Sequence, residues 1–157
     1  MRTKFDGTTW AFALLIMAFA GNAAAHAAHA DLAKLPAGPI RDRVQLMEDI
    51  GADAKKINEA LKAGDAQAMI APAEHIAAIA PQFPELFPEG STDPSSRAKP
   101  NIWTKPDEFE AHNEYLVQHA IAIATAAKSG GNTKAAVRKL FKDCKGCHKQ
   151  YRIPDED

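Results

Sequence analysis

Apolar residues recur every three or four positions in four separate stretches of the chain, which is the period of an amphipathic α-helix. These stretches cover 39–63, 66–83, 104–129 and 132–151, and Pro72 is expected to kink the second helix or to lie in its first turns. No stretch shows the alternating pattern of a strand. Two of the three connections are short, so the sequence predicts an all-α fold, an antiparallel up-down-up-down four-helix bundle.

The connection between the second and third helices, residues 81–103, differs from the other two. It contains five prolines, but also Phe83, Phe87 and Trp103, which are too apolar for a free linker. We therefore expect this connection to fold back onto the bundle, and loops of this length are often functional. Thr104 is expected to cap the third helix.

The N-terminal segment has the pattern of a secretory signal peptide. Arg2 and Lys4 precede an apolar run at 10–20, and small residues follow up to Ala30. The apolar run is shorter than the roughly 20 residues that span a bilayer, which disfavours the alternative of a retained anchor. The sequence predicts a cleaved signal at 1–30 and a mature domain at 31–157 in the periplasm, with no membrane span after cleavage.

Composition excludes one class of partner. The 157-residue chain has a formal net charge of −1, and removing the predicted signal leaves −2. A broad basic surface for nucleic acid is therefore not expected. An oxidising compartment would also favour disulfides, but the chain has only two cysteines.

Those two cysteines form the motif Cys144-x-x-Cys147-His148 near the end of the fourth helix. This motif is the attachment signature of c-type haem: the two thiols bond to the vinyl groups, and the histidine is the proximal iron ligand. A structural zinc site would need further ligands, a thioredoxin-like pair would need a βαβ context, and a disulfide would close only a tiny loop. Covalent haem is the interpretation that we favour.

Two residues of the first helix are candidates for the other side of the haem. In an up-down-up-down bundle the first helix begins where the fourth ends, so Met47 and His148 can face each other across a haem. Arg43 lies four residues before Met47 on the same helix face and could pair with a haem propionate. The alternative is that Met47 only fills an apolar pocket. His75, His112 and His119 are further candidate sixth ligands, although exposed or hydrogen-bonded helix histidines are the simpler interpretation.

The chain resembles the cytochrome c-prime family in four segments, "RVQLMEDIG", "FPEGS", "AKPNIW" and the closing "CKGCHKQYR". The resemblance covers nearly all of the mature chain. It implies one covalent haem c, bound through Cys144 and Cys147 with His148 on the iron, and it matches Arg43 to a propionate. It also implies that Arg152 lies near the haem, that Ser91 is a candidate propionate contact, and that some members form homodimers through their first two helices.

Within this family the residue at the position of Met47 separates two functions. Low-spin relatives ligate the iron with methionine, whereas high-spin members have five-coordinate iron that binds nitric oxide or carbon monoxide. We predict a low-spin one-electron carrier with His/Met ligation, a periplasmic redox partner protein and no enzymatic turnover. The alternative is a five-coordinate haem protein that binds these gases, and a third class is a helical interaction module without haem.

Overall fold

The computed structural model describes residues 32–93 and 96–154, so the predicted signal at 1–30 lies outside the described residues. Within them the chain is helical, and an isolated bridge pairs Ala98 with Arg152. None of the described helices is both long and apolar enough to cross a membrane. The elements in chain order are η1 (Leu32–Lys34), α1 (Pro39–Ala63), η2 (Gln67–Met69), α2 (Ile70–Ile79), η3 (Ala80–Gln82), η4 (Pro84–Leu86), α3 (Asn101–Thr104), α4 (Pro106–Ser129) and α5 (Thr133–Tyr151).

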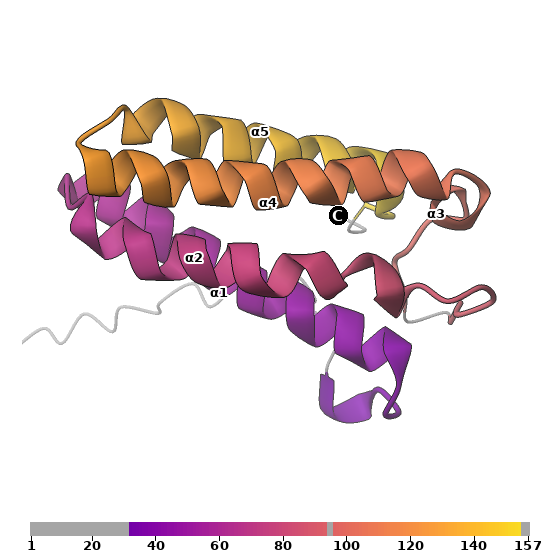
Figure 1. Cartoon of the computed structure of the whole chain (residues 1–157). Helices are drawn as coiled ribbons and strands as arrows, with labels where there is room; N and C mark the ends of the chain where they lie inside the picture. The colour runs from indigo at the N-terminus through magenta and orange to yellow at the C-terminus, as the bar shows by residue number, and fades with distance from the viewer. Residues whose placement is uncertain (1–31, 94–95, 155–157) are drawn as a thin grey trace, which may run out of the picture.

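Four of these helices, α1, α2, α4 and α5, form the predicted antiparallel bundle (Figure 1). Successive helices pack side by side, and α5 also contacts α1. Helix α1 begins and α5 ends at the same end of the bundle, where the long connection between α2 and α4 also lies (Figure 1). The predicted four-helix bundle is therefore confirmed, and α3 adds a single turn within the connection.

The helix ends follow local chemistry. Helices α1 and α4 end at Gly64 and Gly130, both with φ of 70°, a left-handed conformation that glycine adopts without steric cost. The side chain of Asn132 caps α5 by accepting from the backbone N–H of Ala135 at 2.9 Å. The predicted cap at Thr104 is wrong, because Thr104 already belongs to the α3 turn. Helix α4 instead begins with Pro at its first position, which fixes φ without a side-chain cap.

The central core is built from small and branched aliphatic side chains. Alanines such as Ala73 and Ala120 are fully buried between larger side chains and let the helices approach closely. Pro72 lies in the first turn of α2, as the sequence predicts, and is buried. The largest side chains with almost no exposure are Ile57, Met69, Ile76, Ile123 and Leu140.

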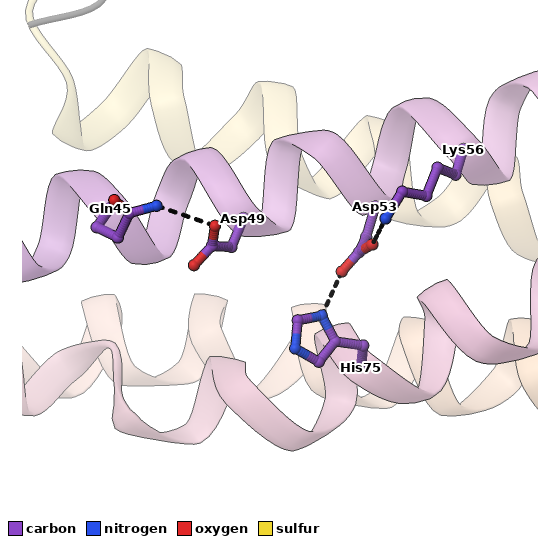
Figure 2. Close-up of polar contacts among 5 residues, drawn as sticks. All are labelled: Gln45, Asp49, Asp53, Lys56 and His75. Carbon is purple, nitrogen blue, oxygen red and sulfur yellow. Dashed lines mark hydrogen bonds and ion pairs between the residues drawn. The ribbon is translucent and has the colours of Figure 1, made fainter.

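One charged group is buried between α1 and α2. The side chain of Asp53 is 5% exposed; its carboxylate accepts from Lys56 Nζ at 2.8 Å and lies 2.5 Å from His75 Nδ1 (Figure 2). Burial alone would raise the pKa of Asp53, but the hydrogen bonds from Lys56 and His75 outweigh it and lower the pKa. His75 is therefore a partner of this carboxylate and ties α2 to α1.

Candidate functional site

An aromatic cluster fills the end of the bundle where the long connection folds back. The ring centroids of Phe87 and Phe109 are 4.9 Å apart, and those of Phe109 and Tyr151 are 5.1 Å apart. The indole nitrogen of Trp103 donates to the carbonyl of Phe87 at 3.0 Å. The connection thus packs on the bundle, as the sequence predicts. We call this group the aromatic cluster; its members are Phe83, Phe87, Ile102, Trp103, Phe109 and Tyr151.

Cys144 and Cys147 lie at the border of two apolar regions. Cys144 packs against the central core, whereas Cys147 packs against the aromatic cluster. Both are half-buried, and they do not form a disulfide with each other. Burial, with a smaller effect of the Asp143 charge, raises the pKa of Cys144 to about 11 and that of Cys147 to about 12. Before haem attachment the two thiols are therefore neutral, and their surroundings are apolar.

The end of α5, a few residues after His148, is fastened to the connection. The backbone N–H of Lys99 donates to the Tyr151 carbonyl at 2.9 Å, and that of Ile153 donates to the Arg97 carbonyl at 2.7 Å. The His148 side chain is half-buried, and its pKa is lowered by burial and, to a smaller extent, by the positive charges of Arg152 and Arg97. This environment favours the neutral imidazole, which is the form that binds a metal ion.

Arg43 clamps the connection to α1. It is 4% exposed, and its guanidinium donates to Ser91 Oγ at 2.9 Å, to the Ser91 carbonyl at 2.8 Å and to Ser96 Oγ at 2.6 Å. A longer bond of 3.3 Å reaches the carbonyl of Leu86, and the guanidinium carbon lies 4.6 Å from the centre of the Phe87 ring. These acceptors are all neutral, and burial lowers the pKa of Arg43. The positive charge is thus buried among neutral partners, an arrangement that suits an additional anion.

Met47 is half-buried on α1 and packs against the central core, as does Cys144. Arg43 and Cys147 are related in a similar way, because both contact the aromatic cluster, Arg43 through Phe87. Met47 and Cys144 thus border the central core, whereas Arg43 and Cys147 border the aromatic cluster.

The other histidines also have partners, and His112 lies next to the aromatic cluster, with its ring centroid 5.5 Å from that of Tyr151. His112 Nδ1 is 3.5 Å from Asp143 Oδ1, and His119 stacks on Tyr115 with ring centroids 6.5 Å apart. Among the described residues, no group of three or more His, Cys, Asp or Glu side chains could hold a metal ion. His75 is bound to Asp53, so each of the three histidines has a side-chain partner within the bundle.

Sequence reasoning missed part of this site. It did not anticipate Ser96 and the Leu86 carbonyl as acceptors for Arg43, or Phe83 and Tyr151 as parts of one cluster. The density of aromatic residues between 83 and 109 is a signal for such a cluster. The sequence does not indicate which groups accept hydrogen bonds from Arg43, because serine side chains and backbone carbonyls occur in every loop.

Together these residues fit a c-type haem. Two cysteines three residues apart lie in apolar surroundings that suit a macrocycle, and a half-buried histidine follows them. Among the described residues, the buried guanidinium of Arg43 donates to neutral acceptors alone. A helical bundle with this motif at the end of its last helix defines a class of haem-binding protein, the c-type cytochromes with a four-helix fold.

Comparison with known proteins gives the family. A family model described as Cytochrome C′ matches residues 38–152. A cytochrome c-556 from Agrobacterium tumefaciens (strain II Chrys) is 34% identical over 74% of this chain and 98% of its own length. A cytochrome c′ from Pararhodospirillum photometricum is 40% identical over 51% of this chain and 66% of its own length.

Solved structures agree with this assignment. The crystal structure of cytochrome c′ from Thermochromatium tepidum matches with a TM-score of 0.67 and 27% identity, over 74% of this chain and 95% of that one. Cytochrome c prime from Shewanella frigidimarina matches with a TM-score of 0.68 and 29% identity, over 74% and 94%. The chain belongs to the cytochrome c′ family, and it is a monohaem c-type cytochrome with one covalent haem c.

Proposed function

We propose that this protein is a periplasmic one-electron carrier in which Cys144 and Cys147 would hold the haem through thioether bonds and His148 and Met47 would bind its iron. The haem supplies a one-electron couple between ferrous and ferric iron. The predicted signal at 1–30 supports the periplasmic location, since an exported chain reaches an oxidising compartment. The observation that supports the proposal is that α1, which carries Met47 in its first half, begins at the end of the bundle where α5, which carries Cys144, Cys147 and His148, ends (Figure 1).

The roles of the ligands follow from their chemistry. His148 offers a neutral imidazole, because burial and two nearby arginines lower its pKa. Met47 offers a thioether, a soft ligand that favours the reduced iron and raises the reduction potential. A pair of ligands held on two packed helices changes little between oxidation states, which suits electron transfer.

Arg43 and Arg152 have supporting roles in this proposal. A propionate would give the buried guanidinium of Arg43 a charged partner, and Ser91 and Ser96 hold that guanidinium in place. Arg152 follows the ligating turn and contributes positive charge beside His148. Both charges would favour a bound anionic group on this side of the molecule.

The second candidate function is binding of a small gas by five-coordinate iron. The observation that favours it is the fold match, with a TM-score of 0.67 and 19% identity, to a ferrous variant of the cytochrome c prime from Alcaligenes xylosoxidans with bound NO. In this case Met47 would line an apolar pocket without binding the iron. Under either function the protein is not a typical enzyme.

Substitution of methionine separates the two candidates. Met47→Leu keeps the apolar volume and removes the sulfur, and Met69→Leu is the matched control, because Met69 is 1% exposed in the central core. We expect the absorption spectrum of the oxidised holoprotein to lose its sulfur-to-iron band in Met47→Leu and to keep it in Met69→Leu. An unchanged, high-spin spectrum in both variants would contradict methionine ligation.

A further inference from the structure

Helix α5 carries a row of basic side chains along its solvent-exposed face. Its members follow each other at spacings of four, four, three and four residues, which places them on one side of an α-helix over its whole length. All of them are exposed. We call this row the basic stripe; it consists of Lys134, Arg138, Lys142, Lys145 and Lys149.

The positive charge of the stripe is not neutralised by its own helix. The one acidic residue of α5 is Asp143, whose side chain is only 14% exposed and turns toward His112 of α4. In the part of the chain that the structure describes, the stripe side chains form no ion pair with a carboxylate. The predicted mature chain is negative overall, whereas α5 carries six Lys or Arg side chains and a single Asp.

An exposed aromatic residue borders the stripe. Phe141 is 38% exposed and lies three residues after Arg138 and four before Lys145, so it is a surface neighbour of both. Exposed aromatics beside positive charges are typical of protein–protein contacts, where they act as anchors.

The stripe also overlaps the haem-binding turn. Lys145 lies between the two cysteines, and Lys149 directly follows His148. A partner that covers the C-terminal half of the stripe therefore lies over the segment that holds the haem. Electron transfer between proteins needs such a short approach, and complementary charge steers the encounter.

We propose that the basic stripe, with Phe141 as its anchor, is the docking surface for an acidic redox protein. This inference rests on the proposed electron-carrier function and identifies the chemistry of its partner. An anionic membrane surface is the rival occupant, but membrane-surface helices present a wide apolar face, and on α5 the exposed large apolar side chain is Phe141 alone.

The test uses charge reversals at the two ends of the stripe. Lys145→Glu/Lys149→Glu alters the half next to the haem motif, and Lys134→Glu/Arg138→Glu alters the distant half with the same change in net charge. The probe is a reduced plant-type [2Fe–2S] ferredoxin, an acidic one-electron donor, and stopped-flow absorbance follows reduction of each oxidised holoprotein. The milder Lys145→Gln/Lys149→Gln variant serves if charge reversal impairs haem attachment.

We expect the wild-type rate constant to fall with rising salt concentration. Lys145→Glu/Lys149→Glu should lower it about tenfold at low salt, and Lys134→Glu/Arg138→Glu about two- to threefold. Phe141→Ser should slow the reaction without changing its salt dependence. Equal effects of the two double variants, or no effect, would overturn the proposal.

Two further results separate the outcomes. Sedimentation with phosphatidylglycerol vesicles that depends on Lys145 and Lys149, with unchanged ferredoxin rates, would assign the stripe to a lipid surface and overturn the proposal. Binding of carbon monoxide to the iron would contradict Met47 ligation. Even then, a larger loss of the ferredoxin reduction rate in Lys145→Glu/Lys149→Glu than in Lys134→Glu/Arg138→Glu would support the docking surface.

Discussion

The central core and the aromatic cluster solve two different packing problems in one bundle. The core contains alanine, isoleucine, leucine, valine and methionine without an aromatic ring, and it lets four helices lie close together. The aromatic cluster contains five aromatic side chains from the connection, α4 and the end of α5, where the long connection folds back onto the bundle. From this difference we infer that packing between the helices determines the stability of the bundle, whereas the connection between α2 and α4 forms much of the candidate haem site.

The largest expected effect on stability lies in the core. Ile123 has no exposed surface, so Ile123→Ala should lower the free energy of unfolding of the holoprotein by about 2–5 kcal/mol, through lost burial and a cavity. The absorption spectrum should not change. Denaturant titration measures the free energy of unfolding. A change in the absorption spectrum would contradict the view that the core determines stability without affecting the haem site.

Removing the clamp at Arg43 should affect both stability and the site. Arg43→Met keeps the stem but leaves the Leu86, Ser91 and Ser96 acceptors without a donor, which should cost about 1–3 kcal/mol. Hydrogen exchange should accelerate in the connection, and the haem spectrum should shift. The matched control is Arg41→Met, because Arg41 is exposed on the same helix. Equal behaviour of the two variants would contradict the clamp.

Asp53 should produce an acid-dependent loss of stability. Its pKa is lower in the folded protein than in the unfolded chain, so its contribution is present above about pH 4 and is lost as the pH falls through the folded value. Asp53→Asn should reduce this loss when unfolding free energies are compared between pH 3 and pH 7. Asp49→Asn is the control, since Asp49 is exposed on the same helix (Figure 2). If the unfolding free energy of Asp53→Asn fell between pH 7 and pH 3 by as much as that of the wild type, this role of Asp53 would be excluded.

The smallest expected effect is at the turn before α5. Asn132→Ala removes the cap on the Ala135 N–H and should cost about 1 kcal/mol, with no change in the spectrum. Thermal unfolding of the holoprotein is a sufficient measurement. A larger loss, or a shifted spectrum, would mean that this turn is coupled to the site.

The sequence predicts the four helices well because the apolar period and the glycine ends are local signals. It fails at Thr104, since the α3 turn depends on how residues 101–105 pack in the connection. The haem motif is also local, so Cys144, Cys147 and His148 can be identified as candidates by spacing alone. The partners of Arg43 cannot, because they come from residues 43 to 53 positions away in the chain.

The measurement that tests the central claim most directly is the visible absorption spectrum of the reduced holoprotein before and after addition of carbon monoxide. If Met47 ligates the iron, the spectrum is low-spin with sharp bands and does not respond to the gas. A broad high-spin spectrum that sharpens with carbon monoxide would contradict the electron-carrier proposal and assign the protein to gas binding.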